Sequence, residues 1–135
     1  MRRFDRYRQE ILEELVKMQR EIDPDVVFIP SENDLHQDHF IVAREGIRAF
    51  KMKTIFAYEM PWNNISFSTQ AFIHLDESHL ETKIAALRQY QSQAKRSYAS
   101  EEFLRSLAVT RGTSAGVRYA EAFEVVRLII NSKTL

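Results

Sequence analysis

The 135-residue sequence contains no cysteine, only three glycines and three prolines, and no excess of charge of either sign. Without cysteine there are no disulfide bonds, thiolate metal ligands or cysteine nucleophiles, so a metal must bind through histidine or carboxylate side chains. The low glycine and proline content argues against fibrous or long disordered segments. We therefore expect one domain over residues 1–135, a length that buries about two-thirds of the unfolded surface.

The charge balance and the lack of long apolar runs restrict the partners and the location of the protein. Nineteen basic residues balance nineteen acidic residues, so no net field attracts nucleic acid or an anionic membrane, and we expect neither as a partner. No stretch approaches the roughly 18 apolar residues of a membrane span, and the arginines after Met1 precede no apolar signal segment. These features predict a cytoplasmic protein without a membrane span.

Hydrophobic periodicity indicates alternating helices and strands in the first half of the chain. Apolar residues at spacings of three and four predict an amphipathic helix over about residues 4–21, which Asp23-Pro24 ends. The apolar run 26–29 predicts a strand buried on both faces. A second helix around residues 41–50 and a second strand at 54–58 follow. This order predicts an α/β fold, a Rossmann-like parallel sheet flanked by helices.

The second half is less regular. We expect a strand at residues 71–75, a helix at 77–90, and a further helix from 100 to about 111 that ends near Gly112. The tail from residue 122 to residue 130 is apolar enough for a strand or a buried final segment. No internal repeat or linker interrupts the chain, which supports the expectation of one domain.

A polar loop over residues 31–39 follows the first predicted strand and concentrates two histidines and two carboxylates. Open α/β sheets bind ligands beyond the carboxyl ends of their strands, which is where this loop lies. His36 and His39 are three residues apart and share one face if the next helix begins there. Such a pair can bind zinc, or one histidine can bind it while the other meets charge on the substrate. Asp34 and Asp38 are the neighbouring carboxylates.

A purely structural interpretation of the same loop stays open. Asp34 and Gln37 have the spacing of a capping box, and carboxylates stabilise a helix N-terminus without any function. Two histidines do not make a catalytic zinc site, which has three protein ligands and an open position for water. His74 and His79 belong to no metal-binding pattern, so we expect surface or half-buried roles for them.

Several short runs extend the pattern beyond this loop. Residues 24–30, PDVVFIP, followed by DLHQDH at 34–39, resemble the second signature of the LmbE/PIG-L family of zinc-dependent N-acetylglucosaminyl deacetylases. The resemblance implies the fold of an enzyme family whose members hydrolyse an N-acetyl group on an amino sugar or glycoconjugate and release acetate. Further matches in the family's order are Tyr58-Glu59-Met60-Pro61, residues 83–87 with Ser92-Gln93, and Arg111-Gly112 with residues 119–123.

The resemblance also implies roles for individual residues. His39 would be the zinc ligand, and His36, as an imidazolium, would stabilise the oxyanion that forms when water attacks the acetamide carbonyl. Asp38 would orient and tune His36. The resemblance also implies that Glu121 faces the ligand-binding crevice at the carboxyl ends of the strands. The alternative interpretation is a solvent-exposed glutamate without such a role.

The loop after the second predicted strand is a second candidate for contact with a sugar. Trp62 could provide an aromatic platform, and Asn63 and Asn64 could provide amide hydrogen bonds. A turn whose tryptophan packs on the surface is the equally plain alternative.

The sequence departs from the family in one large respect. The first family signature, Ala-His-Pro-Asp-Asp-Glu, supplies the other His and Asp zinc ligands and the aspartate that acts as general base, and no such run is present. The first predicted helix corresponds to the middle of the family domain, so we expect the opening strands to be absent. Zinc should then be weakly held or absent in the isolated chain, and the chain should be inactive alone.

The sequence is therefore compatible with three functions. The first is part of a zinc-dependent deacetylase acting on an N-acetylated sugar, completed by a missing N-terminal half. The second is a non-catalytic remnant or interaction module of the same fold, whose exposed sheet edge is covered by another chain or by self-association. The third is an unrelated metal protein that uses two histidines.

Overall fold

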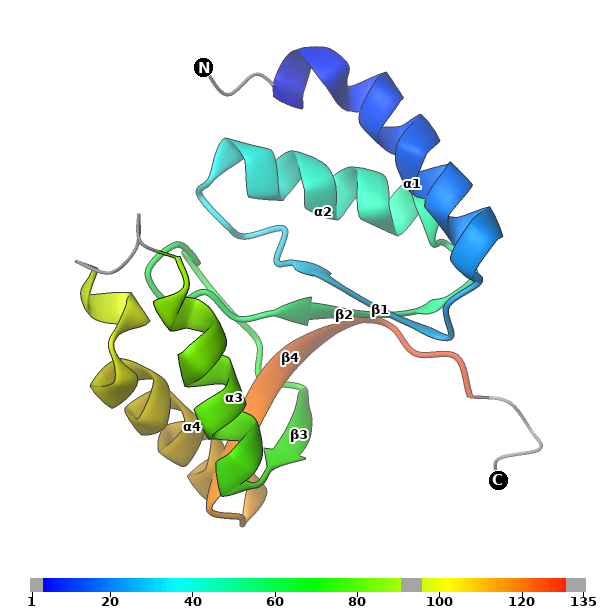
Figure 1. The fold of residues 1–135 in the computed structure, drawn as a ribbon. Helices are drawn as coiled ribbons and strands as arrows, with labels where there is room; N and C mark the ends of the chain where they lie inside the picture. Colours follow the sequence, from blue (N-terminus) through cyan, green and yellow to red (C-terminus); the bar gives the residue numbers. More distant parts are fainter. Residues whose placement is uncertain (1–3, 91–95, 131–135) are drawn as a thin grey trace. The chain divides into compact units, whose positions relative to one another are not determined.

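The structure is a computed structural model that describes residues 4–90 and 96–130 (Figure 1). Contacts between residues divide it into two compact units, one formed by residues up to 70 together with residues from 123 onward, the other by residues 71–122. Ser92 and Gln93, which contribute to the family resemblance, lie outside the described residues. No described helix is long and apolar enough to cross a lipid bilayer.

The first unit begins with two helices and two parallel strands. A 3-10 helix, η1 (Phe4–Tyr7), leads into α1 (Arg8–Ile22), and β1 (Val26–Pro30), α2 (Gln37–Ala49) and β2 (Thr54–Tyr58) follow. The helix, strand, helix, strand order expected from the sequence is confirmed. The C-cap of α1 is Asp23, which adopts the left-handed conformation and donates its N–H to the Gln19 carbonyl. Pro24 follows it and prevents further helix.

Strands β1 and β2 pair in parallel from Val26 opposite Thr54 to Pro30 opposite Tyr58. The alternation of side chains along the strands directs one set of residues toward the helices, where they form the core of the unit. The apolar face of each helix packs against the apolar face of the strands, so the periodicity of apolar residues in the sequence predicts which residues form this core. Its members are Ile29, Ala43, Phe50, Ile55 and Ala57, with Leu15, Val27, Ile47 and Ala49 packed against them.

The last strand makes the sheet mixed. β4 (Tyr119–Arg127) pairs with β2 in the antiparallel sense, with an irregularity between Ile55 and Phe56. The strand order is β1-β2-β4-β3. The α/β class is thus confirmed, and so is the parallel pairing of the first two strands, whereas the final strand reverses direction. A strand of that direction needs no crossover helix, and the sequence periodicity alone does not report direction.

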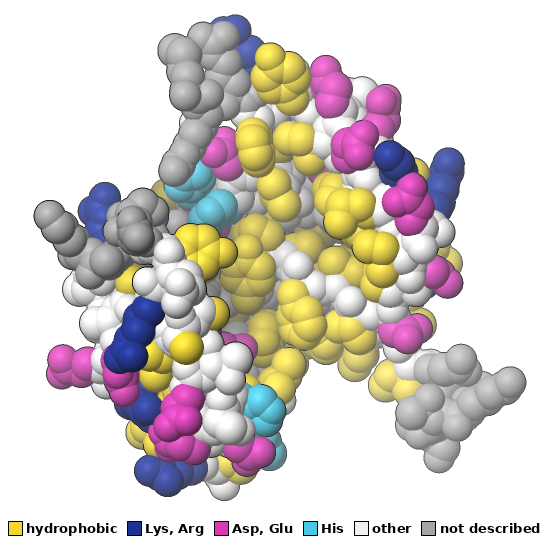
Figure 2. Space-filling view, in the orientation of Figure 1, with side chains coloured by type: hydrophobic (Ala, Val, Ile, Leu, Met, Phe, Trp, Pro, Cys, Tyr) yellow, Lys and Arg dark blue, Asp and Glu magenta, His cyan; other side chains and the backbone are white. Residues whose placement is uncertain are grey.

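The prediction that β1 is buried on both faces is wrong. Ile29 is buried, but Val26 and Phe28 are 44% and 48% exposed. Val26 and Phe28 alternate with Val27 and Ile29, so they lie on the sheet face opposite the one that packs against the helices of this unit. β1 also stands at the end of the strand order, so its outer edge has no paired strand within the described residues. Phe28 lies 5.2 Å from Phe123 and 6.0 Å from Phe56 between ring centroids, so the exposed residues extend an aromatic cluster. Figure 2 shows hydrophobic side chains gathered over the region of β1 and β2.

An exposed edge with apolar neighbours predicts association. We expect the chain to self-associate in sedimentation experiments or to bind a dye that fluoresces on apolar surface, because open parallel edges expose unpaired backbone groups. Phe28→Lys should reduce both signals. Val109→Lys, at a position of similar exposure on a helix of the other unit, is the matched control and should change neither. A compact monomer that binds no dye would contradict this expectation.

The second unit contains β3 (Ala71–Leu75), α3 (Glu77–Arg88), η3 (Ser97–Ala99) and α4 (Glu101–Ala115), together with the first four residues of β4. His74 is exposed on β3, and Nδ1 of His79 accepts the Asp76 N–H at 3.1 Å at the start of α3. Both histidines are exposed, in agreement with the expectation of surface or half-buried positions. The buried core of this unit consists of Leu80, Ile84, Leu104, Ala108 and Tyr119.

The sequence predicts that the helix starting near residue 100 ends near Gly112, but α4 extends beyond this residue. It continues to Ala115, and the left-handed C-cap is Gly116 with φ of 71°. Gly112 is buried within the helix, where a Cβ atom would lie 2.6 Å from the carbonyl oxygen of Arg118. This glycine therefore permits close approach of two backbone segments and does not terminate the helix.

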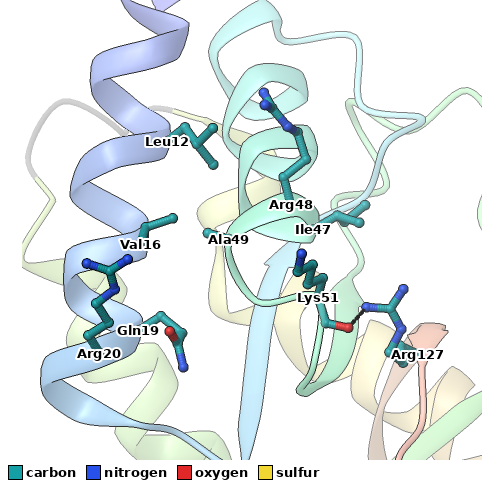
Figure 3. Close-up of a pocket in the computed structure, with 9 residues that line it drawn as sticks. All are labelled: Leu12, Val16, Gln19, Arg20, Ile47, Arg48, Ala49, Lys51 and Arg127. Carbon is teal, nitrogen blue, oxygen red and sulfur yellow. Dashed lines mark hydrogen bonds between the residues drawn. The ribbon is translucent and has the colours of Figure 1, made fainter.

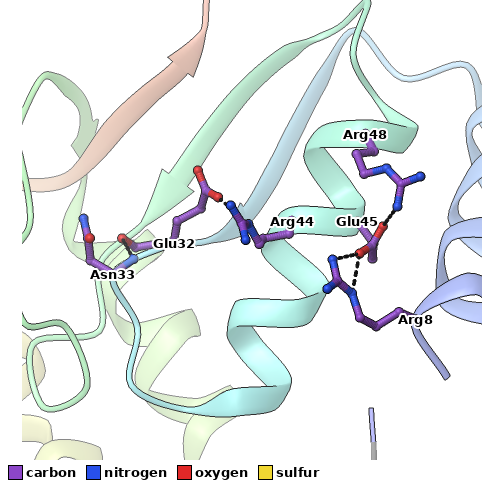
Figure 4. Close-up of polar contacts among 7 residues, drawn as sticks. Arg8, Glu32, Asn33, Arg44, Glu45 and Arg48 are labelled. Carbon is purple, nitrogen blue, oxygen red and sulfur yellow. Dashed lines mark hydrogen bonds and ion pairs between the residues drawn. The ribbon is translucent and has the colours of Figure 1, made fainter. Parts of the chain in front are cut away.

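A buried carboxylate joins the start of α1 to α2 in the first unit (Figure 4). Glu45 has no exposed side-chain surface, and its Oε1 accepts hydrogen bonds from Arg8 Nε at 2.9 Å and Nη2 at 2.5 Å. Its Oε2 accepts a hydrogen bond from Arg48 Nη1 at 2.5 Å. Burial raises the pKa of Glu45, but the hydrogen bonds and charges of the two arginines outweigh it and hold the pKa below its ordinary value.

This network predicts a pH-dependent contribution to stability. Because folding lowers the pKa of Glu45, its contribution is complete above the carboxyl's ordinary pKa and is lost as the pH falls through the lowered value. Glu45→Gln should cost about 1 kcal/mol of unfolding free energy at neutral pH, since its amide oxygen still accepts from the arginines. Denaturant unfolding of both proteins at several acidic pH values should show the difference shrinking as the pH falls. A constant difference would contradict the assignment.

Candidate functional site

The histidine loop lies at the carboxyl end of β1 and leads into α2, in the first unit. His36 is the N-cap of α2, with φ of −76° and ψ of 114°, and its Nδ1 accepts the Asp38 N–H at 3.3 Å. The strand, loop and helix order predicted for this segment is confirmed. The capping-box interpretation of Asp34 and Gln37 is wrong, because the helix begins at Gln37 and Asp34 lies in the preceding loop.

Asp34 joins the two histidines through its two carboxylate oxygens. Oδ1 accepts the backbone N–H of His36 at 2.7 Å, which is the local turn that aspartate favours. Oδ2 lies 2.8 Å from Nδ1 of His39, in the first turn of α2. The Asp34 side chain is fully buried and that of His39 is 30% exposed. A buried carboxylate on Nδ1 fixes the ring orientation and leaves Nε2 as the nitrogen for another ligand.

The two imidazole rings lie together. Their centroids are 4.4 Å apart, and the ring planes differ by 26°, so His36 and His39 stack. The N-cap position of His36 and the helical position of His39 produce this contact, because residues three apart share one face of a helix. The histidine pair is therefore a local cluster at the carboxyl end of β1, where α/β folds place their ligands.

The hydrogen bond at His36 determines which nitrogen carries the proton. Nδ1 accepts the Asp38 N–H and is therefore unprotonated while this bond is present. The neutral ring then carries its proton on Nε2 and presents one N–H donor. This hydrogen bond favours a neutral Nε2–H donor over the imidazolium that the family resemblance implies, and such a donor can also stabilise a developing oxyanion.

Asp38 lies in the first turn of α2 and is 8% exposed. A carboxylate is favourable at this position because the free N–H groups at a helix N-terminus attract negative charge. Its backbone N–H supplies the bond to His36 described above. The orientation of His36 by the Asp38 carboxylate stays a prediction.

The second loop that the sequence singled out lies against the histidine loop. Asp34 and Asn64 form an isolated antiparallel bridge, the Leu35 N–H donates to the Asn63 carbonyl at 3.0 Å, and the Ile65 N–H donates to the Asn33 carbonyl at 3.1 Å. The fold thus brings the loop that carries Trp62 and Asn63, after β2, beside the loop after β1. Trp62 is 39% exposed.

Glu121, the remaining predicted site residue, belongs to the second unit. Its carboxylate accepts a short hydrogen bond from Lys83 within that unit. This ion pair gives the side chain a structural role between α3 and β4. Substrate contact by Glu121 stays a prediction.

Sequence reasoning missed two residues near the loop. Tyr58 ends β2, and burial, followed by the charge of Asp34, raises the pKa of its phenol above its ordinary value. Glu124 supports the base of the loop: its Oε2 accepts from Ser31 Oγ at 2.6 Å, and Ser31 Oγ accepts the Asn33 N–H at 3.1 Å. Tyr58 stands in a run similar to the family, which could have indicated it. Glu124 carries no local signal, since its partner is far away in sequence.

The described residues can supply one ligand, His39, to a metal site, but not a complete set of ligands. His39, with the Asp34 carboxylate on its Nδ1, has the arrangement of a metal-ligating histidine and its orienting partner. Among residues 4–90 and 96–130, no group of three or more histidine, aspartate or glutamate side chains is placed to hold a metal ion. A catalytic zinc site has three protein ligands, so these residues would need ligands from elsewhere.

Three solved structures share the α/β fold of this chain at low sequence identity. The conserved protein TT1542 from Thermus thermophilus is 22% identical, with a TM-score of 0.75 over 92% of this chain and 61% of its own. N,N'-diacetylchitobiose deacetylase from Pyrococcus horikoshii, complexed with its inhibitor MPG, is 20% identical, with a TM-score of 0.68 over 93% and 56%. GalB, the 4-carboxy-2-hydroxymuconate hydratase from Pseudomonas putida, is 20% identical, with a TM-score of 0.69 over 92% and 61%.

These likenesses establish the fold, and the sequence comparisons add no family. No family model matches the chain, and no curated protein matches its sequence. The chain spans 56–61% of the length of the three solved structures. A deacetylase and a hydratase share this fold, so the reaction must be argued from the site.

Proposed function

We propose that this chain forms part of a metal-dependent hydrolase that removes acetyl groups from N-acetylated amino sugars or glycoconjugates, and that it is inactive alone. The observation that carries the proposal is the stacked pair of His36 and His39 at the carboxyl end of β1, with the buried Asp34 carboxylate on His39. The fold shared with a chitobiose deacetylase supports it. The family-like runs along the sequence point to the same chemistry.

His39 would hold the metal and His36 would meet the substrate. Asp34 orients His39 so that Nε2 faces away from the buried carboxylate. When bound, zinc supplies Lewis acidity, which polarises the amide carbonyl and makes water acidic enough to react near neutral pH. His36 would donate Nε2–H to the carbonyl oxygen as negative charge develops there. Asp38, in the first turn of α2, would hold His36 in place.

The substrate would lie against the neighbouring loop. Trp62 offers a partly exposed aromatic surface, on which the apolar face of a sugar ring can stack. The loop hydrogen bonds at Asn63 hold that loop beside the histidines. Glu121 is retained as a candidate contact from the family resemblance.

The rest of the metal site would come from a polypeptide segment outside this sequence. The described residues supply no group of three metal ligands, and the solved structures with this fold are longer. The edge of β1 that is unpaired among the described strands lies directly before the histidine loop and could accept a further strand. A segment paired there would reach the site at the carboxyl end of the sheet.

The test is to supply that segment in trans. The first half of an LmbE/PIG-L-type deacetylase, with its His-Pro-Asp-Asp signature, is mixed with this chain, zinc and N-acetylglucosamine derivatives, and acetate release is measured. Acetate should appear only in the mixture. His74→Ala is the matched control, because this exposed histidine lies on β3 and should leave the rate unchanged. Acetate release by this chain alone, or a mixture that binds zinc and releases no acetate, would count against the proposal.

A second candidate function is an interaction module of the same fold. The exposed Val26 and Phe28 on an edge unpaired within the described residues favour it, because such an edge is a template for another chain. Under this function, a partner would bind the chain equally well after His36→Ala or His39→Ala. Phe28→Lys would abolish the binding.

A further inference from the structure

A pocket of about 660 Å³ lies between α1 and α2 in the first unit (Figure 3). It is formed by the C-terminal part of α1 and the C-terminal end of α2. The histidine loop is at the other end of α2, roughly 18 Å away along a helix of this length. The pocket is therefore separate from the candidate hydrolase site. Its volume is in the range of small-molecule sites.

The pocket has apolar walls from both helices. Leu12 and Val16 project from α1 toward α2 in Figure 3, and Ile47 and Ala49 line the side of α2. These side chains provide a surface on which an apolar group can be removed from water. An occupant with an apolar body would gain free energy from that contact.

The charged lining residues are all basic. Arg20, Arg48, Lys51 and Arg127 contribute to the pocket, and no described aspartate or glutamate does. Arg48 donates to Glu45, and Arg127 donates a short hydrogen bond to the Lys51 carbonyl. Neither the Arg20 nor the Lys51 side chain has an ion pair or hydrogen bond within the described part of the chain. As far as residues 4–90 and 96–130 show, a free cation thus stands on each side of the pocket.

A role at the helix ends explains part of this charge. Arg20 lies in the last turn of α1, and Lys51 follows α2, where cations offset the negative end of a helix dipole. Stabilisation of the helix ends does not, however, require Arg20 and Lys51 to lie on either side of a pocket with apolar walls. The two features together complement an anion attached to an apolar body.

We infer that this pocket binds a small organic phosphate with an apolar body. A phosphate monoester carries close to two negative charges at neutral pH and accepts hydrogen bonds on three oxygens. The planar fork of arginine fits these oxygens, and lysine adds a point charge. Arg20 and Lys51 contact the phosphate, while Val16 and Ile47 contact the apolar body.

Isothermal titration with hexyl phosphate at low salt tests the inference. We expect saturable binding of one molecule per chain, at least about tenfold tighter than inorganic phosphate or hexanoate and weakened by added salt. Hexan-1-ol, which lacks the anion, should not bind measurably. Equal affinity for inorganic phosphate or hexanoate, or binding of hexan-1-ol as tight as that of hexyl phosphate, would overturn the assignment.

Substitutions locate the binding. Arg20→Gln with Lys51→Gln should weaken hexyl phosphate binding at least about tenfold, whereas Lys17→Gln, an exposed lysine of α1 outside the pocket, should not. Thermal unfolding of each variant shows whether the fold is intact. A double variant that is folded and binds normally would overturn the inference, as would an equal loss in Lys17→Gln. Binding should survive His39→Ala, because the pocket is independent of the proposed hydrolase site.

Discussion

Replacing His39 by alanine should remove both the metal and the activity of the reconstituted enzyme, whereas replacing His36 should remove only the activity. His39 is the assigned metal ligand, so its loss leaves the metal with an incomplete set. His36→Ala should keep most of the metal and slow turnover by about a hundredfold or more, the effect of deleting one oxyanion donor. Metal content by atomic absorption and acetate release are measured on the same samples.

The carboxylates near the pair should give graded effects. Asp34→Asn should weaken metal binding by about 10- to 100-fold, because it removes the charge that orients His39 through Nδ1. Asp38→Asn should have an intermediate effect on rate, since it keeps both imidazoles. If His36→Ala and His39→Ala lose metal equally, or if the mixture works with both histidines replaced, the assigned roles are wrong.

The largest effect on stability should come from Gly112→Ala. The new Cβ would lie 2.6 to 2.7 Å from backbone atoms of Val117 and Arg118, and no rotamer change can move a backbone carbonyl away. Overpacking of this kind costs about 3 kcal/mol, which exceeds the gain of about 1 kcal/mol from the helix propensity of alanine. Calorimetry should show a loss of about 2 kcal/mol, or roughly 6–10 °C in melting temperature.

Gly116→Ala is the matched control for this substitution. Gly116 adopts φ of 71°, and a Cβ there would meet nothing within 4 Å. Only the left-handed conformation then opposes alanine, at a cost of about 1 kcal/mol. Gly112→Ala that is as stable as the parent, or less damaging than Gly116→Ala, would show that α4 and the following turn are packed differently.

The spacing of apolar residues and the positions of helix-breaking residues predicted most of the helices and strands. The apolar stripe of α1 and the break at Asp23-Pro24 give the helix and its end, because each depends only on neighbouring residues. The direction of β4 depends on which strands pair, and the exposure of Val26 and Phe28 depends on which face of the sheet is covered; local patterns encode neither. Gly112 resembled a helix terminator because its real constraint is contact with Arg118, a residue beyond the helix.

In the candidate site, too, local features were predictable from the sequence, whereas contacts that depend on the folded chain were not. The proximity of His36 and His39 follows from their spacing and from the position of the loop after a strand. The link from Asp34 to His39 requires the loop to fold back, so Asp34 looked like a capping residue. Glu124 supports the loop from a distant strand, and no spacing pattern could connect it with Ser31.

In the proposed enzyme, this chain contributes His39 to a metal site that a second polypeptide segment completes. The most direct test is titration of zinc into the dialysed chain and into its mixture with the complementary half. Zinc should bind the isolated chain weakly and lose that affinity in His39→Ala, and the mixture should bind one zinc at least about a hundredfold more tightly as the missing ligands and their partners are added. An isolated chain that retains one tightly bound zinc after dialysis, or a mixture whose zinc affinity is unchanged by His39→Ala, would contradict the claim.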